Sequence, residues 1–194
     1  MEFLIPDWND IYEMCIKLAD KIKKSGFFPD LIIGVARGGW IPARILSDLL
    51  ENSNVASVRV EFYVDIAKTS HSPKITQGVS VSLTGRKILV VDDVADTGKS
   101  LKAVIDYLYN LGAKEVKTAT LHYKPKSIIK PDFYIEETDA WIVYPHERFE
   151  FIKSIVKKLK SEGKTLNEIK LEVENIGLPK TLVNKFVEEI YYKL

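Results

Sequence analysis

A chain of 194 residues, 46% apolar and 28% charged, has an ordinary globular composition and is long enough for one domain with a sizeable core. Its formal net charge of +1 excludes a bulk attraction to nucleic acid or to an anionic membrane. The single cysteine, Cys15, excludes an internal disulfide and a cysteine metal cluster, and no stretch has the ~18 consecutive apolar residues of a membrane helix. The start of the chain does not have the composition of a signal peptide, so we expect a cytoplasmic protein without a membrane partner.

The first part of the chain alternates helical patterns with apolar runs that are typical of buried strands. Residues 7–24 carry apolar side chains at helical spacing and predict a helix. Residues 30–36 form a short apolar run that ends at Arg37-Gly38-Gly39, and a helical pattern follows over residues 41–50. Residues 55–64, rich in valine and aromatic side chains, predict a second strand.

The middle of the chain repeats this alternation. Residues 87–91 predict a strand, and residues 100–111 predict a helix that is closed by Gly112. A further strand is expected at residues 116–122 and a weaker one at residues 132–136. Apolar strands that alternate with helices indicate a parallel sheet covered on both faces, with ligands at the carboxyl ends of its strands.

Two segments stand apart from this pattern. Residues 65–78 are polar and lack a helical period, which is consistent with an exposed hairpin loop or with a mobile lid over an active site. From about residue 149 to the end the pattern is purely helical.

The run Val90–Ser100 (VVDDVADTGKS) places three acids beside residues that suit a phosphate. A helix that starts near Thr97 would present unpaired backbone N–H groups and the positive end of its dipole to an anion. The end of the run fits a Walker A loop, but the first glycine of that motif would fall at position 93. Asp93 would point a carboxylate at the nucleotide phosphates, so we reject an ATPase.

A ribose 5-phosphate accounts for the acids and the donors together. Asp92 and Asp93 only accept hydrogen bonds, so they suit a metal ion or the two hydroxyls of a vicinal diol. The phosphate would lie at the helix N-terminus, and Asp96 would remain near the anomeric carbon. The whole pattern therefore predicts a sugar-phosphate site, whereas an acid pair alone is more often a solvated turn.

The same run resembles the phosphoribosyl pyrophosphate (PRPP) binding motif of the type I phosphoribosyltransferases. Arg37-Gly38-Gly39 resembles the pyrophosphate loop of that family, and residues 65–78 lie where its catalytic hood loop belongs. The resemblance implies an α/β fold with a twisted, mainly parallel sheet flanked by helices, here with a helical C-terminal extension. We expect the phosphoribosyltransferase domain at residues 1–149 and the extension at residues 150–194.

The resemblance also implies roles for individual residues. Pyrophosphate of PRPP is displaced by a nucleobase nitrogen with Mg²⁺ as cofactor, and Asp92 and Asp93 hold the ribose hydroxyls directly or through the metal. Asp96 acts as the general base that takes the proton from N7 of a purine. The 5-phosphate is bound by the loop residues Ala95, Asp96, Thr97, Gly98, Lys99 and Ser100, and the pyrophosphate by Arg37 and Gly38. Carboxylates near the sugar would stabilise its developing positive charge.

The base-binding residues resemble those of the hypoxanthine, guanine and xanthine branch, most closely its compact microbial and archaeal type. In that branch a lysine donates to the purine O6, an aromatic ring stacks on the base and the next residue contacts the exocyclic groups. Lys124, Trp141 and Ile142 match this pattern. A lysine only donates hydrogen bonds, so it favours a 6-oxo over a 6-amino group. The implied products are a purine nucleoside monophosphate and pyrophosphate, as in purine salvage.

Two residues near the stacking aromatic have less defined roles. Glu147 is the candidate ligand for a second Mg²⁺, although the spacing aligns in more than one way. His146 is interpreted as a surface histidine and not as a ligand. We also expect a homo-oligomer, either a dimer or a tetramer.

The tail leaves a second class of function open. Residues 165–187, with Gly177 in a turn, faintly resemble a helix-turn-helix, and some members of this fold are regulators that bind nucleic acid. The alternative function is therefore a PRPP- or purine-sensing transcriptional regulator. Against it, residues 150–194 hold nine lysines, seven acids and no arginine, which is not a clear basic stripe, so we do not expect a nucleic acid partner.

Overall fold

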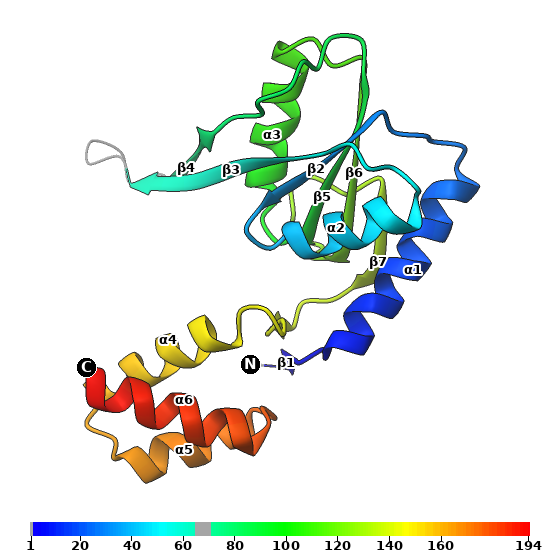
Figure 1. Cartoon of the computed structure of the whole chain (residues 1–194). Coiled ribbons are helices and arrows are strands. Elements are labelled where there is room, and N and C mark those ends of the chain that lie inside the picture. Colours follow the sequence, from blue (N-terminus) through cyan, green and yellow to red (C-terminus); the bar gives the residue numbers. More distant parts are fainter. Residues whose placement is uncertain (1, 65–70) are drawn as a thin grey trace. The chain divides into compact units, whose positions relative to one another are not determined.

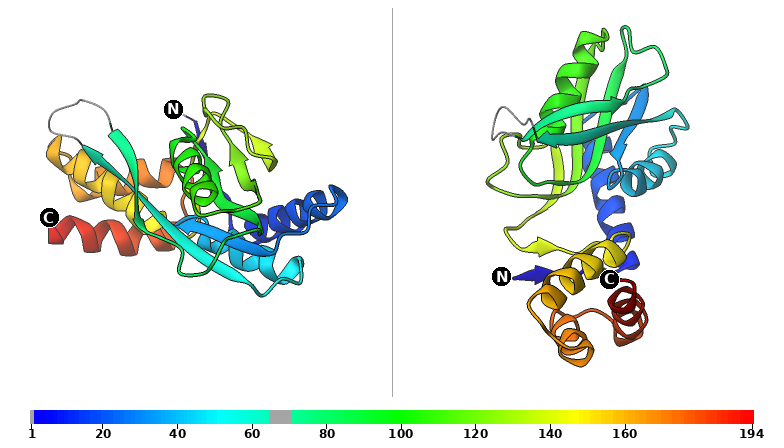
Figure 2. Two further views of the ribbon diagram at one scale, coloured as in Figure 1. Left: turned by 90° about the horizontal axis from the view of Figure 1, so that it is seen from above. Right: turned by 90° about the vertical axis from the view of Figure 1, so that its left-hand side faces the viewer.

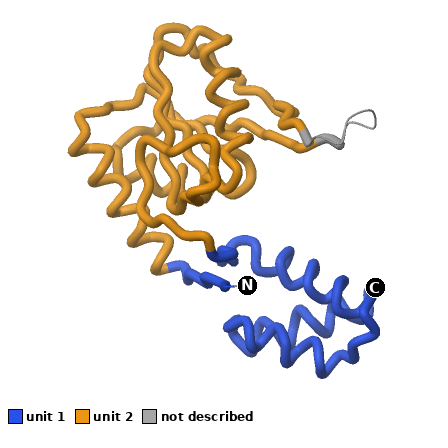
Figure 3. Tube along the Cα trace, turned by 180° about the vertical axis from the view of Figure 1, so that it is seen from behind, with its two compact units in different colours: residues 1–8, 140–194 blue, residues 9–139 orange. Residues whose placement is uncertain are grey.

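The computed structural model describes residues 2–64 and 71–194, which form two compact units (Figures 1 and 3). The larger unit is Asn9–Asp139, and the smaller one combines Met1–Trp8 with Ala140–Leu194. We expected the chain to divide at 149/150, whereas contacts group residues 140–149 and the first eight residues with the tail. The expected boundary of the phosphoribosyltransferase domain at residue 149 therefore stays a prediction, and it does not coincide with the boundary between these two units.

The larger unit is built on a six-stranded sheet of order β4-β3-β2-β5-β6-β7 (Figure 1). The strands are β2 (Leu31–Ala36), β3 (Val55–Val64), β4 (His71–Gln77), β5 (Lys87–Ala95), β6 (Glu115–Tyr123) and β7 (Phe133–Glu137). In the described part of the chain, β4 pairs antiparallel with β3, and every other pair in this sheet is parallel. The expected α/β architecture with a mainly parallel sheet is present.

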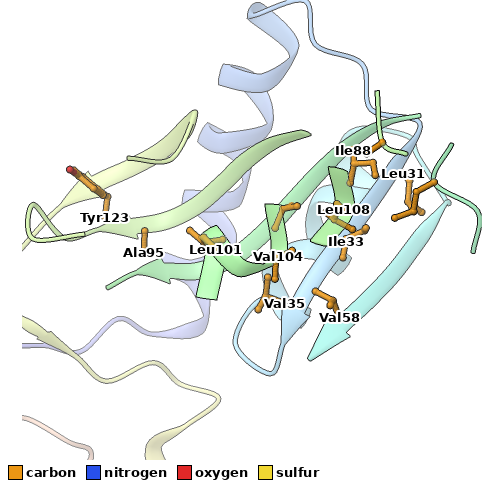
Figure 4. Close-up of a cluster of buried hydrophobic side chains, with 13 residues drawn as sticks. Leu31, Ile33, Val35, Val58, Ile88, Ala95, Leu101, Val104, Leu108 and Tyr123 are labelled. Carbon is orange, nitrogen blue, oxygen red and sulfur yellow. The ribbon is translucent and has the colours of Figure 1, made fainter. Parts of the chain in front are cut away.

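Helices cover both faces of this sheet. The larger unit has α1 (Trp8–Lys24, whose first residue belongs to the smaller unit), α2 (Trp40–Leu49) and α3 (Lys99–Asn110). Apolar side chains of α3, among them Leu101 and Leu108, form one core with Ile33 and other strand residues (Figure 4). On the opposite face α2 packs closely, because a Cβ at Gly34 would stand 3.1 Å from Cβ of Ala43. Figure 2 shows α1 on the same side as α2.

The sheet has a topological switch point between β2 and β5. The chain leaves β2 through α2 to β3 on one side, whereas β5 pairs with the other side of β2 and continues through α3 to β6. The loops after β2 and β5 therefore diverge at the carboxyl ends of neighbouring strands, which is where open α/β sheets bind ligands. Arg37-Gly38-Gly39 and the end of the run Val90–Ser100 both lie at this point.

The expectation of a loop over residues 65–78 is wrong for His71–Gln77, which forms β4. Residues 65–70 lie outside the described part of the chain. β4 is an edge strand with β3 as its sheet neighbour, so it needs no continuous apolar run and tolerates Pro73. A polar composition therefore hid this strand from sequence analysis.

The smaller unit is helical apart from one pair of short strands. β1 (Phe3–Leu4) pairs parallel with β8 (Trp141–Ile142), and three helices follow. These are α4 (Arg148–Ser161), α5 (Leu166–Asn175) and α6 (Lys180–Lys193), which share a buried apolar core. Within the ranges that the structure describes, no helix has the length and apolar character needed to cross a membrane.

The helix pair expected in the tail is present. Thr165 starts α5 with a capping box, Gly177 turns the chain at a φ of +107°, and α6 follows. Lysines of this pair form ion pairs with acids of the same pair: Lys170 with Glu188 at 3.1 Å and Lys180 with Glu174 at 3.7 Å. These lysines therefore face acids of the same helix pair, which does not favour an exposed basic stripe for nucleic acid.

Candidate active site

The acid pair, Asp92 and Asp93, lies within the last residues of β5 and not after the strand. The strand was expected to end at residue 91, but it continues through Asp92 and Asp93 to Ala95. The N–H of Asp93 donates to Oδ1 of Asp92 (3.0 Å), and the N–H of Val94 donates to Oδ1 of Asp93 (2.8 Å). Burial and the charge of Asp93 raise the pKa of Asp92 well above its usual range. A cation or sugar hydroxyls at this position would relieve the repulsion.

The loop after β2 (residues 36–39, the glycine loop) packs directly on this acid pair. A Cβ at Gly38 would stand 2.2 Å from Oδ2 of Asp93, and a Cβ at Gly39 would stand 2.2 Å from the carbonyl oxygen of Val91. Both positions therefore need glycine so that the backbone can approach β5. The peptide bond between Ala36 and Arg37 is cis, and the Arg37 side chain is exposed.

The loop after β5 (residues 95–100, the phosphate loop) lines a pocket of about 380 Å³. Gly98 precedes α3 in the left-handed conformation with a φ of +74° and has no side chain to cap the helix, while the N–H of Lys99 donates to Oγ1 of Thr97 (3.4 Å). The backbone N–H groups of the first turn lie at the end of the helix, where they lack partners within α3 and suit an anion. The pocket is lined by Asp92, Val94, all six loop residues, Leu101 and Phe62. Phe62 is half exposed on β3, and sequence analysis missed it because its place in an alternating strand carries no chemical signal.

The side chain of Asp96 is held by two lysines. Its Oδ1 lies 2.9 Å from Nζ of Lys126 and 3.5 Å from Nζ of Lys124. Burial acts to raise the pKa of Asp96, but Lys126 and Lys124 outweigh it and lower the pKa below its usual value. Lys124 is itself buried, which is unusual for a lysine and requires such a partner. Sequence analysis singled out Lys124 and missed Lys126, whose position alone gives no signal.

A buried histidine lies in the sheet beside this site. His122 on β6 is aligned with Val94 of β5 and is 1% exposed, and its Nε2 lies 3.9 Å from a carboxylate oxygen of Glu136. Burial lowers the pKa of His122 to about 4, despite the opposing influence of Asp93. The imidazole is therefore neutral at physiological pH.

The remaining predicted residues belong to the smaller unit. Trp141 on β8 is 50% exposed, whereas Ile142 is buried. Trp141 and Glu147 line one pocket of about 440 Å³ together with residues of β1 and α4. His146 is not a surface histidine as expected: it is half-buried and stacks on Tyr144 with ring centroids 5.2 Å apart.

A comparison with protein families matches residues 5–150 to the phosphoribosyl transferase domain. The chain belongs to the phosphoribosyltransferase family. The resemblance seen in Val90–Ser100 and the expected fold class are thereby confirmed. The tail beyond residue 150 lies outside the match.

Curated relatives and solved structures that are similar to this chain are also purine phosphoribosyltransferases. The hypoxanthine-guanine phosphoribosyltransferase of Schizosaccharomyces pombe is 30% identical over 181 residues, covering 72% of this chain and 86% of the relative. The xanthine-guanine phosphoribosyltransferase of Gluconobacter oxydans is 30% identical over 141 residues, covering 71% and 80%. The structure of a purine phosphoribosyltransferase from Pyrococcus horikoshii has a TM-score of 0.69 and 40% identity, covering 75% of this chain and 94% of that one.

The acid pair of the transferase site offers oxygen ligands that suit a metal ion. Among the described residues, no three side chains of His, Cys, Asp or Glu gather into a metal cage. Asp92 and Asp93 nevertheless place two carboxylates side by side, and burial together with the charge of Asp93 raises the pKa of Asp92. Mg²⁺ is commonly held by one or two carboxylates together with substrate phosphates, which is what this pair can offer.

Proposed function

We propose that the protein transfers the 5-phosphoribosyl group of PRPP to a 6-oxopurine base (guanine, hypoxanthine or xanthine) and releases the purine nucleoside monophosphate and pyrophosphate. One observation carries the proposal: Asp92 and the phosphate loop line a single pocket, and the buried Lys124 lies 3.5 Å from Asp96 of that loop. The names of the relatives support the choice of base. Such a reaction serves purine salvage.

Different parts of PRPP are assigned to different groups of the site. The 5-phosphate lies at the N-terminus of α3, where backbone N–H groups, hydroxyls and Lys99 donate to its oxygens. Asp92 and Asp93 accept hydrogen bonds from the ribose hydroxyls. As the bond to pyrophosphate breaks, their charge stabilises the positive charge that develops at C1′. The backbone of Arg37 and Gly38 lies beside the acid pair and approaches the pyrophosphate.

The purine then supplies a nucleophile and loses a proton. N9 forms the new bond to C1′, and the proton on N7 passes to the ionised carboxylate of Asp96, so the purine leaves the reaction uncharged. Lys124 donates to the 6-oxo group, whereas the 6-amino group of adenine would meet it as a second donor. We assign stacking on the base to the exposed ring of Trp141 and contact with the exocyclic groups to the backbone of Ile142.

Mg²⁺ belongs to the proposal through Asp92 and Asp93, with Glu147 as a candidate for a second ion. When bound, the metal neutralises charge on the pyrophosphate leaving group. The carboxylates of the acid pair would hold it. The protein is further proposed to be a cytoplasmic homo-oligomer. Analytical ultracentrifugation would measure its number of subunits.

The test measures pyrophosphate release from PRPP with guanine, hypoxanthine and xanthine as separate substrates, and with adenine as the control. We expect release that depends on a 6-oxopurine and on Mg²⁺, with much lower rates for adenine. Absence of base-dependent release would refute the proposal. Release with adenine at the rate of guanine would overturn the assigned base while leaving the transferase reaction in place.

A further inference from the structure

Two lysines of one loop converge on a single oxygen of Asp96. Nζ of Lys126 is 2.9 Å from Oδ1 and Nζ of Lys124 is 3.5 Å from the same atom, which is itself buried. The two lysines differ in their surroundings, because the side chain of Lys124 is 9% exposed and that of Lys126 is 58% exposed. Lys126 is the nearer of the two cations, and it is the one to which the proposed reaction assigns no role.

The backbone fixes Lys126 opposite Asp96. Residues 124–129 (the lysine loop) run beside the phosphate loop: the N–H of Lys124 donates to the carbonyl of Ala95 (3.0 Å), and the N–H of Ile128 donates to the carbonyl of Thr97 (3.0 Å). These hydrogen bonds lie on either side of Lys126 and on either side of Asp96. The ion pair is consequently a product of two joined loops and not a chance meeting of long surface side chains.

The proposed reaction makes competing demands on Lys124. Its ammonium has to donate to the 6-oxo group of the purine, yet it also faces the buried oxygen of Asp96. The side chain of Asp96 is 47% exposed, but its Oδ1 is buried, so this oxygen would be left uncompensated if it lost the cation that faces it. If Lys124 were the one counter-charge, binding the base would strip Asp96 of its partner when Asp96 has to be charged and oriented.

We propose that Lys126 is a positioning residue that keeps Asp96 in place and ionised while Lys124 is released to the purine. The proposal rests on the function proposed above and adds a division of labour between two lysines of one loop. Lys126 and Lys124 are the cations that act on Asp96 most directly, while Asp92 and Lys99 are the other charged residues that line the pocket of the phosphate loop. Because Lys126 is largely exposed, its neutral variant should fold.

The kinetic test compares Lys126→Gln with Lys126→Arg in the whole enzyme, using guanine and saturating PRPP. In the glutamine variant Lys124 remains bound to Asp96, so KM for the base should rise about threefold while KM for PRPP stays unchanged. Without Lys126 the pKa of Asp96 rises, and activity is lost as pH falls through that pKa. The acid limb of kcat/KM should therefore move to higher pH, and arginine should restore both properties.

A matched control is Lys102→Gln, which removes another exposed lysine from an ion pair with an aspartate, Asp106 on α3. It should leave KM and the pH profile unchanged. The inference is overturned if Lys126→Gln has the wild-type KM and acid limb, if KM for PRPP rises instead, or if Lys126→Arg is as impaired as the glutamine variant.

A second readout does not depend on turnover. The ¹³C shift of the Asp96 carboxyl in the free protein reports its titration, whose midpoint should rise in Lys126→Gln and stay constant in Lys102→Gln. An unchanged midpoint in the first variant would remove the ion pair from the proposal. If the wild type releases no pyrophosphate with any base, the proposed function fails, whereas an active wild type with silent variants rejects the role of Lys126 alone.

Discussion

The glycine loop and the phosphate loop leave neighbouring strands at one edge of the sheet, but different properties define them. The glycine loop fits by shape, because Gly38 and Gly39 bring the backbone against β5 where no Cβ has room. The phosphate loop works through charge, with Asp96 between two lysines and the N-terminus of α3 beside it. One loop should therefore be sensitive to an added atom and the other to a lost charge. Substitutions of each kind test this contrast.

The largest effect is expected where charge changes without shape. Asp96→Asn keeps the outline of the side chain but cannot accept the N7 proton, so kcat should fall about a thousandfold, with little change in PRPP affinity. Single-turnover kinetics and PRPP binding by calorimetry separate the two quantities. The matched control, Asp106→Asn on the outside of α3, should be active. Turnover at the wild-type rate would show that Asp96 is not the general base.

The converse change alters shape without charge. In Gly38→Ala the new methyl group would meet the carboxylate of Asp93, so kcat/KM for PRPP should fall about a hundredfold as the acid pair shifts. Gly85→Ala is the control: it has a φ of +75° but open space around it, so it should lower stability and leave KM for PRPP intact. If Gly38→Ala has normal kinetics, the glycine loop is not defined by close approach.

A smaller effect on activity is expected from a substitution of Lys124, the residue proposed to contact the base. Lys124→Ala removes the donor to the 6-oxo group, so the preference for guanine over adenine, measured as a ratio of kcat/KM, should narrow about tenfold. Lys102→Ala is the matched surface control. Unchanged discrimination in Lys124→Ala would move the contact with the 6-oxo group to another residue.

The smallest effect at neutral pH is expected from His122 in the sheet, and it concerns stability and not activity. The pKa of His122 is lowered to about 4, so between pH 6.5 and 4 the unfolded chain binds more protons than the folded one. The free energy of unfolding should fall over this range as pH drops, by on the order of 3 kcal/mol in total. His122→Gln should abolish that component in denaturant titrations at pH 7 and 4.5. An identical pH dependence in the variant would place the titrating group elsewhere.

The sequence predicted those parts of the molecule that depend on residue type along one strand or loop. The buried strands around Ile33 and Val90 are apolar because both faces are covered, and the phosphate loop has its own compact pattern. β4 escaped notice because an edge strand can be polar, and β1 and β8 because each has two residues and pairs with a distant segment. Lys126 was missed because its partner is fixed by backbone hydrogen bonds between two loops, which no local pattern records.

Gly98 joins these loops in a way that matters for protein engineering. A Cβ at this position would stand 2.4 Å from Oγ of Ser127, so the phosphate loop and the lysine loop share one contact surface. A lysine loop grafted from a relative to alter base choice would have to bring residues 95–100 with it. In evolution, too, substitutions in one loop would require matching substitutions in the other. Base specificity and binding of the sugar phosphate would therefore change together.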